Sequence, residues 1–222
     1  MSLFMESENK NLLIEGAKTF GIYWVEKTIE AFDLYLRELL KWNQKINLTT
    51  IRTEKGIVLK HFLDSLSLFP YLPNSFFLLD IGSGAGFPGI PLKIIQPRLE
   101  ITLIDSVRKK VDFQRHAIRL LGLKGIEAIH GRVQDKEILQ SMGDRFDTVV
   151  SRAFSDLQTL LILSYPFLKK GGILLAMKGE GPHEEIASSL KEEGTRYRLQ
   201  KTVSLLLPFS SYKRSILLFE KG

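Results

Sequence analysis

A glycine-rich segment that begins with an acid, Asp80-Ile81-Gly82-Ser83-Gly84-Ala85-Gly86-Phe87-Pro88-Gly89, carries the clearest chemical signal in the sequence. Glycines let a backbone turn tightly and approach a ligand, and a helix that starts after such a turn directs its N–H groups toward that ligand. Three of the glycines fit the dinucleotide-binding spacing G-x-G-x-x-G: Gly84, Gly86 and Gly89. Asp105 follows near the distance expected for an acid that holds a ribose. This pattern alone leaves a nicotinamide-dependent oxidoreductase open.

The acid that leads the loop favours a different ligand. A carboxylate at Asp80 would repel a pyrophosphate, but it would attract a ligand that carries an ammonium and a sulfonium group. Gly82 follows two residues later, so the segment reads D-x-G-x-G-x-G and resembles motif I of class I S-adenosylmethionine-dependent methyltransferases. Asp105 would accept hydrogen bonds from the ribose hydroxyls of either cofactor. The remaining alternative is a tight turn that binds no ligand. Such a turn alone seldom requires several glycines together with two acids in these positions.

The first seventy or so residues are predicted to be helical. Apolar residues recur at three- and four-residue spacings over 22–42, which is typical of an amphipathic helix. A polar break at 43–50 precedes a shorter helical stretch over 54–68. Pro70, Pro73 and Asn74 end this block. We therefore expect an N-terminal helical extension over residues 1–74.

From residue 75 onward, strands alternate with helices. The predicted strands cover 76–81, 100–105, 125–130, 146–151, 173–178, 203–208 and 215–220, and the helices start after Pro88 and cover 108–121, 156–168 and 183–193. Such alternation predicts an α/β, Rossmann-like domain over 75–222 with a mostly parallel seven-stranded sheet. The last two strands lack an intervening helix and should pair antiparallel. The glycine loop and Asp105 then lie at the edge where ligands bind to such sheets.

Composition narrows the class further. There is no cysteine, which excludes disulfides, thiolate metal sites and a cysteine nucleophile. No apolar run approaches the roughly 20 residues of a membrane span, so we expect a cytoplasmic protein that does not bind membranes. The net charge of +6 and the pI of about 9.4 favour a polyanionic partner.

Absent motifs restrict the methyl acceptor. Methylation at carbon 5 of a pyrimidine needs a cysteine to attack the ring. Methyltransferases that act on exocyclic amines usually carry Pro-Pro-aromatic after the fourth strand, where this chain has Ser151-Arg152-Ala153-Phe154. Ribose methyltransferases typically have an acid at the position of Arg152. Two kinds of methyl acceptor remain. One is an atom that needs no deprotonation, such as a purine ring nitrogen, and the other is a small molecule or a protein.

A family resemblance joins these features. Five segments closely resemble the bacterial small-subunit ribosomal RNA (guanine-N7) methyltransferases, the RsmG or GidB family, and occur in the family's order: Asn47-Leu48-Thr49, His61-Phe62-Leu63-Asp64-Ser65-Leu66, Asp80 through Pro91, Ser151-Arg152-Ala153 and Met177-Lys178-Gly179. The resemblance runs from about Asn43 to the C-terminus. It implies that the substrate is a guanine near the decoding centre of 16S rRNA, in free RNA or in the small ribosomal subunit. A non-catalytic RNA-binding module on the same scaffold stays an alternative.

The resemblance and the loop together give a set of candidate site residues. For S-adenosylmethionine these are Asp80, Gly82, Ser83, Gly84, Gly86, Phe87, Asp105, Ser106, Val133, Gln134 and Arg152. For the RNA they are His61, Arg152 and Lys178. We expect no catalytic general base, no metal and a monomer. Gln134 departs from the family, which commonly has Glu there, so the adenine contact would rest on backbone groups.

Several candidates have a plain structural reading beside the functional one. His61 and Asp64 lie one helical turn apart and could form a buried hydrogen-bonded pair instead of contacting RNA. Lys178 ends a strand and could contact a phosphate. Five basic residues lie on one predicted helix that is either a solvated face or a phosphate-binding one: Arg108, Lys109, Lys110, Arg115 and Arg119. Trp24 and Trp42 are expected in the core.

Overall fold

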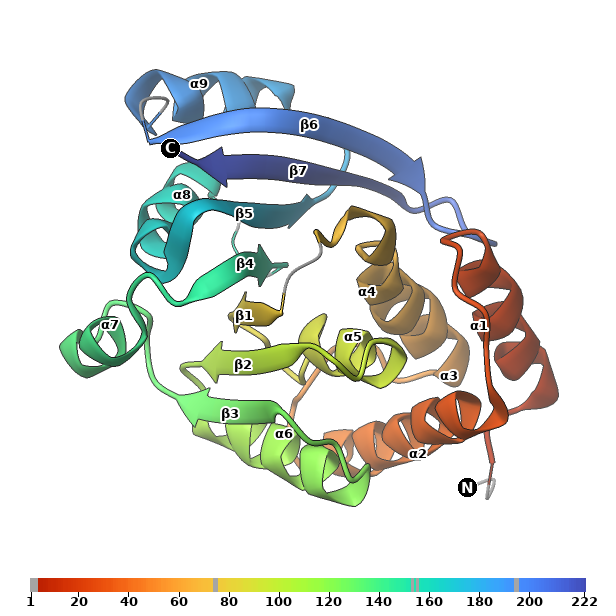
Figure 1. The fold of residues 1–222 in the computed structure, drawn as a ribbon. Helices are drawn as coiled ribbons and strands as arrows, with labels where there is room; N and C mark the ends of the chain where they lie inside the picture. The colour runs from red at the N-terminus through yellow and green to blue at the C-terminus, as the bar shows by residue number, and fades with distance from the viewer. Residues whose placement is uncertain (1–3, 74–75, 153, 155, 194–195) are drawn as a thin grey trace.

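The computed structural model describes residues 4–73, 76–152, 154, 156–193 and 196–222. Its centre is one seven-stranded sheet in the order β3-β2-β1-β4-β5-β7-β6 (Figure 1). The strands are β1 (Phe77–Ile81), β2 (Glu100–Asp105), β3 (Ile126–His130), β4 (Phe146–Ser151), β5 (Leu168–Lys178), β6 (Tyr197–Leu206) and β7 (Lys213–Lys221). β1 to β5 run parallel, and β7 is antiparallel to both β5 and β6. The predicted sheet and its antiparallel last pair are confirmed.

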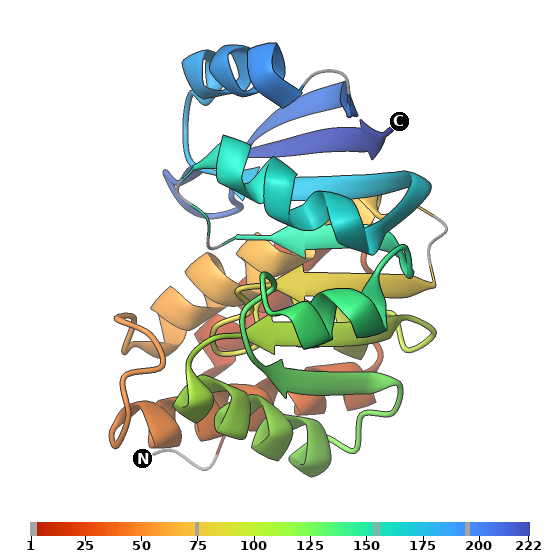
Figure 2. The ribbon, with the colours of Figure 1, turned by 90° about the vertical axis from the view of Figure 1, so that its left-hand side faces the viewer.

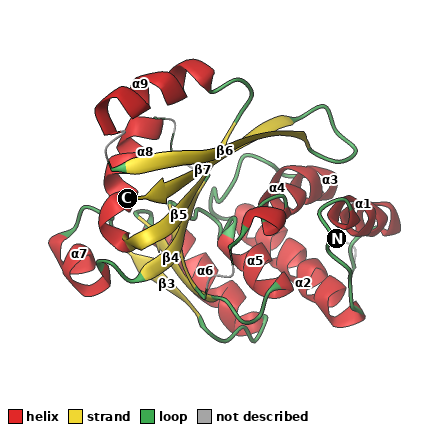
Figure 3. Cartoon of the chain, turned by 45° about the horizontal axis from the view of Figure 1, so that its top comes forward, coloured by secondary structure: helices red, strands yellow, loops and turns green. Residues whose placement is uncertain are grey.

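Helices cover both faces of the sheet, which explains why the residues of β1 other than Asp80 are apolar on both faces instead of alternating with polar ones. Successive side chains of a strand point to opposite faces, so Leu78 joins one core and Leu79 the other. Figure 3 shows α7 (Lys136–Met142), α8 (Leu157–Ser164) and α9 (His183–Glu193) on one side. The extension, α5 (Gly89–Ile95) and α6 (Arg108–Leu120) lie on the other side. The molecule is thus a three-layer α/β/α sandwich.

The N-terminal extension is helical, as predicted. It contains α1 (Ser7–Lys18), α2 (Glu26–Asn43), α3 (Glu54–Ile57), a π-helical segment (Val58–Leu63) and α4 (Asp64–Leu66). Phe32 and Leu36 of α2 are fully buried in the same core as Ile90 of α5 and Phe113 of α6. Trp24 and Trp42 pack against that core, as expected. The predicted boundary at residue 74 lies outside the described residues.

Several elements differ from the prediction. β5 starts at Leu168 rather than 173, and α8 ends at Ser164 rather than 168. β6 starts at Tyr197 rather than 203, because it is an edge strand whose polar residues Arg198, Gln200 and Lys201 and a register irregularity after Leu199 hide the strand pattern. The short helix α7 was not predicted, since its seven residues give too little periodicity. Within the described part of the chain, no helix is long and apolar enough to cross a membrane.

Candidate cofactor and substrate site

The glycine loop connects the end of β1 to α5 at the edge of the sheet where the parallel strands end. Figure 2 shows the arrowheads of β1 and β2, in yellow and yellow-green, at this one edge. Gly84 has φ +59°, and a Cβ added there would meet no atom within 4 Å, so this part of the loop is open to a ligand. Gly86 has φ +96°, and its Cβ would lie 2.4 Å from Cδ1 of Ile90. The two positions therefore need glycine for different reasons, ligand approach and close packing.

Three elements hold the loop through polar contacts. The carboxylate of Asp105, at the end of β2, accepts a 2.8 Å hydrogen bond from the Gly84 amide. The amide nitrogen of Gln114, on α6, donates to Ser83 Oγ at 2.8 Å and to the Gly84 carbonyl at 2.6 Å. The hydroxyl of Tyr35, on α2, donates to the Ala85 carbonyl at 2.6 Å. The loop is thus fixed before any ligand binds.

Two of these holders, Gln114 and Tyr35, were not among the predicted site residues. Both side chains are essentially fully buried, and a buried polar side chain must find a partner. The available signal was the position of Gln114 next to the apolar stripe of its helix, where a polar residue is out of pattern. For Tyr35, nothing in the sequence distinguishes its hydroxyl from that of any core tyrosine.

Asp80 lies beneath the loop and not at its open face. The residue has no exposed surface, and its Oδ2 accepts a 2.8 Å hydrogen bond from the amide of Gly89 at the start of α5. Its other oxygen has no partner among the described residues. Burial raises the pKa of Asp80 to about 7, against the lowering effects of the Gly89 amide and of Arg152. Asp80 therefore supports the turn, and its negative charge at neutral pH is partial.

A cavity of about 250 Å³ opens at the ends of β1, β2 and β3. It brings together five predicted cofactor residues that are up to 52 positions apart in the chain: Gly82, Asp105, Ser106, Val133 and Gln134. Ile81, Ile104, Gly131, Arg132 and Phe154 complete its lining. The Asp105 carboxylate already accepts backbone hydrogen bonds on both oxygens, from Gly84 and from Val107. Each carboxylate oxygen can accept a further hydrogen bond, so the acid remains able to bind hydroxyl groups.

A second cavity of about 460 Å³ adjoins the first, because Phe154 lines both. It contains the predicted substrate residues Arg152 and Lys178. The side chain of Lys178 is 8% exposed, and its ammonium lies 2.7 Å from Oε1 of Glu185 and 3.2 Å from the Phe154 carbonyl. Its charge is therefore already paired, and Lys178 fixes the wall of the cavity that Phe154 forms.

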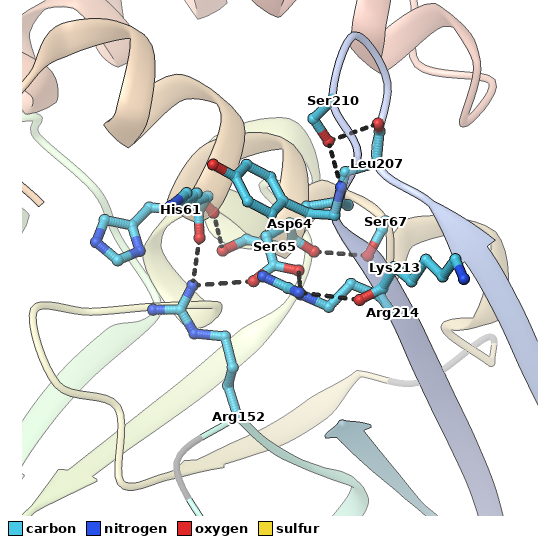
Figure 4. A network of polar contacts seen from close by, with 11 residues as sticks. His61, Asp64, Ser65, Ser67, Arg152, Leu207, Ser210, Lys213 and Arg214 are labelled. Carbon is cyan, nitrogen blue, oxygen red and sulfur yellow. Dashed lines mark hydrogen bonds and ion pairs between the residues drawn. The ribbon is translucent and has the colours of Figure 1, made fainter. Parts of the chain in front are cut away.

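Arg152 joins the end of β4 to the helical extension (Figure 4). Its guanidinium donates to the carbonyl of Lys60 at 3.1 Å and lies 3.4 Å from Oδ2 of Asp64. The other oxygen of Asp64 accepts a 2.8 Å hydrogen bond from Nε of Arg214. One buried carboxylate thus holds two arginines side by side, which leaves the cluster with a net positive charge at the substrate side of the sheet.

The expected alternative of a hydrogen-bonded pair between His61 and Asp64 is wrong. Asp64 faces the two arginines, while Nε2 of His61 lies 2.8 Å from the hydroxyl of Thr49. The imidazole stacks on the ring of Phe87, with centroids 4.6 Å apart. Burial and the nearby charge of Arg152 lower the pKa of His61 to about 3, so the ring is neutral at physiological pH.

The structure therefore divides the predicted site residues into two groups. Seven of them line the two cavities: Gly82, Asp105, Ser106, Val133, Gln134, Arg152 and Lys178. The other six line neither cavity, and they form or support the loop or pack the aromatic cluster behind it: Asp80, Ser83, Gly84, Gly86, His61 and Phe87. Phe87 is 2% exposed, between His61 and Tyr35, with the Arg152 guanidinium 5.3 Å from its ring centroid.

The sheet order, the antiparallel β7 and the acid-led glycine loop define a class I S-adenosylmethionine-dependent methyltransferase. Among solved structures, TYW2 from M. jannaschii in complex with AdoMet has this fold with a TM-score of 0.57 and 17% identity, over 80% of this chain and 81% of that one. A SAM-dependent methyltransferase from Aquifex aeolicus gives a TM-score of 0.56 and 19% identity, over 73% of this chain and 92% of that one.

The family follows from sequence comparison. The model of the GidB family, rRNA small subunit methyltransferase G, matches residues 28–216, and the chain belongs to this family. The ribosomal RNA small subunit methyltransferase G of Geobacter metallireducens is 43% identical over 96% of both chains. The protein is thus an S-adenosylmethionine-dependent methyltransferase, and the oxidoreductase and non-catalytic alternatives are set aside.

Proposed function

We propose that this enzyme transfers a methyl group from S-adenosylmethionine to N7 of a guanine in 16S rRNA near the decoding centre. The observation that carries the proposal is the pair of adjoining cavities that share Phe154, one beside the glycine loop and one beside Arg152. A methyl donor in the first and a base in the second would meet at this shared wall. The names of the full-length relatives support RNA of the small subunit as the acceptor.

The residues of the first cavity suit the cofactor. Asp105, in its lining, offers a carboxylate to the ribose hydroxyls. Gly84 is not part of the lining, but its amide is hydrogen-bonded to Asp105 and its open face leaves room for the methionine part. The Val133–Gln134 backbone would contact the adenine. Bound S-adenosylmethionine supplies an electrophilic methyl group on its sulfonium. Of the other cofactor candidates, Ser83 and Gly86 act through the shape of the loop, while Asp80, Phe87 and Arg152 support it from behind.

Guanine N7 fits as the acceptor atom because of its own chemistry and because Arg152 lies at the second cavity. Guanine N7 has a free lone pair and no proton, so its attack on a methyl group requires no base. Arg152, in the place of an acid, carries a guanidinium that is already protonated, so it cannot accept a proton. It donates to the Lys60 carbonyl and pairs with Asp64. His61 lies behind the loop and lines neither cavity. The role of this chain's residues is then to hold N7 in line with the methyl group, where near-attack geometry lowers the barrier by several kcal/mol.

The proposal also covers how the two parts of the chain work together, the oligomeric state and the location in the cell. The helical extension, residues 1–74, and the sheet domain, residues 75–222, would act as one unit, because both contribute to the core behind the loop. A monomer in the cytoplasm that meets 16S rRNA or the small ribosomal subunit fits the net charge of +6.

The test is methylation by the purified protein with labelled S-adenosylmethionine, on protein-free 16S rRNA and on small subunits from cells that lack the protein. Mass spectrometry of the digested RNA should find 7-methylguanosine at one position, and the same nucleoside should be missing in those cells. Methylation of another atom would contradict the N7 assignment. Methylation of transfer RNA or protein in place of 16S rRNA would contradict the substrate.

A further inference from the structure

The turn between β6 and β7, residues 207–212, presents an exposed aromatic side chain in a strained backbone conformation. Phe209 has φ +57°, in the left-handed region that glycine or asparagine adopts at lower cost. Its side chain is 57% exposed, and that of the nearby Leu206 is 58% exposed. An exposed phenylalanine in a strained backbone conformation does not add to the stability of the fold. Backbone strain of this kind is found preferentially where a ligand binds.

The exposure does not come from a loose turn. The amide of Leu207 donates to the carbonyl of Tyr212 at 2.9 Å, and the Leu207 side chain is fully buried. The hydroxyl of Ser210 donates to the carbonyl of Leu207 at 2.9 Å and accepts from the amide of Tyr212 at 3.2 Å (Figure 4). The turn is therefore closed from both sides, and it holds Phe209 outward at a defined place.

The turn lies at the same edge of the sheet as the substrate cavity. β7 is antiparallel to β5, so its first residues pair with the end of β5, and Ser215 lies opposite Lys178. The ammonium of Lys60 lies 4.3 Å from the ring centroid of Tyr212. Two residues beyond Tyr212, Arg214 binds the carboxylate of Asp64, which also holds Arg152. A short chain of contacts thus fixes Phe209 relative to Arg152.

The surroundings of the turn are cationic. Four cations lie at or near it, Lys60, Lys213, Arg214 and Arg152, against two acids that pair with them. Glu180 pairs with Lys213, and Asp64 pairs with both arginines, so the cluster keeps a net positive charge. An apolar ring next to several cations is complementary to single-stranded nucleic acid, because the phosphates bind the cations and an unpaired base stacks on the ring. An apolar protein surface would match the ring but not these charges.

We propose that Phe209 is a stacking platform for an unpaired base of the RNA substrate, close in the RNA to the target nucleotide. The proposal rests on the proposed function and adds a contact on the C-terminal hairpin. Phe209 is a positioning residue for RNA: it touches neither cofactor nor reacting atoms. Stacking on an aromatic ring typically accounts for about tenfold in affinity per base.

The test compares variants at Phe209 for binding and methylation of protein-free 16S rRNA. In Phe209→Ala, the Kd and KM for RNA should rise about tenfold, while kcat at saturating RNA and the Kd for S-adenosylmethionine stay unchanged. Phe209→Trp should restore RNA binding. Phe209→Gly should lose it while the free energy of unfolding rises, because glycine relieves the strained φ. RNA affinity should therefore fall while the free energy of unfolding rises, which distinguishes a loss of RNA binding from a loss of folding.

Phe76→Ala is the matched control, because Phe76 is 50% exposed but precedes β1, at the opposite edge of the sheet. It should leave RNA affinity unchanged. Unchanged binding of protein-free RNA by Phe209→Ala would overturn the stacking proposal. If only assembled subunits lost affinity, the turn would bind ribosomal protein, which also overturns it. Absence of RNA methylation by the unmodified protein would instead overturn the proposed function.

Discussion

The hydroxyl of Tyr35 lies 2.6 Å from the carbonyl oxygen of Ala85, and this contact ties the N-terminal extension to the middle of the glycine loop. The ring of Tyr35 stacks on Phe62, with centroids 5.6 Å apart, and contacts Phe87. Burial raises the pKa of Tyr35 well above 10, so the hydroxyl keeps its proton and remains a donor. The extension therefore helps to hold the glycine loop in place.

Tyr35→Phe should weaken cofactor binding although Tyr35 lines neither cavity. The change leaves the Ala85 carbonyl without its donor, which costs about 1–3 kcal/mol in stability and loosens the loop. Calorimetric titration should show a several-fold higher Kd for S-adenosylmethionine. Tyr197→Phe is the control, because its hydroxyl is also buried, 2.8 Å from Ser164 Oγ, but in the core on the other face of the sheet. It should lower stability and leave the Kd unchanged; an equal loss of affinity in both variants would contradict the argument.

This contact also shows how far the sequence alone could lead. The alternation of elements and the glycine spacing are local patterns, so they predicted the sheet, the loop and Asp105. The family resemblance, not a local pattern, predicted Val133 and Gln134 of the first cavity. Which residues hold the loop depends on packing between α2, α6 and β2, and no local pattern records it. For the same reason Asp80 was interpreted as facing the ligand, and the two expectations for His61, RNA contact or a pair with Asp64, did not include its contact with Thr49.

Asp105→Ala should weaken S-adenosylmethionine binding by more than the loss of ribose contacts alone. Each charge-assisted hydrogen bond contributes about 1.5–3 kcal/mol, and the same carboxylate also holds the amides of Gly84 and Val107. The Kd, measured by calorimetry, should rise at least a hundredfold, and nicotinamide dinucleotides should bind to neither protein. Asp147→Ala is the control, since its carboxylate also accepts two backbone hydrogen bonds, from Phe76 and Phe77, but at the opposite edge. A normal Kd in Asp105→Ala would contradict the cofactor assignment.

Neutralising Arg108, Lys109 and Lys110 together should reduce the salt dependence of RNA binding. These residues begin α6, close to the cofactor edge, and Arg108 and Lys109 are exposed. If they contact phosphates, each neutralised contact lowers the slope of log K against log salt by about one. The control neutralises three exposed cations at the opposite edge, Arg98, Lys124 and Arg145. Identical slopes in the two triple variants would mean that this face of α6 is merely solvated.

The buried carboxyl of Asp80 should make stability depend on pH. Burial raises its pKa from 3.8 to about 7, so between these values the folded protein holds a proton that the unfolded chain has lost. The free energy of unfolding therefore decreases as pH rises through this window, by up to about 4 kcal/mol from this group. In Asp80→Asn, denaturant titrations from pH 4 to 7.5 should show a smaller decrease. The exposed control Asp112→Asn should keep the full decrease.

The rate of the methyl-transfer step should be independent of pH, in contrast to the free energy of unfolding. Attack by guanine N7 removes no proton. At the second cavity Arg152 is a donor, and the carboxylates of Glu185 and Glu180 are paired with Lys178 and Lys213. Protonation of Asp80 changes the support of the loop, so its effect should fall on cofactor affinity and disappear when S-adenosylmethionine is saturating. The measurement is the single-turnover rate from about pH 6 to 9 with saturating cofactor and RNA. We expect a flat profile, and the same flat profile in Asp80→Asn. A rate that rises about tenfold per pH unit through neutrality would show that a proton leaves before the methyl group arrives, and the acceptor would then be an amine or a hydroxyl instead of N7.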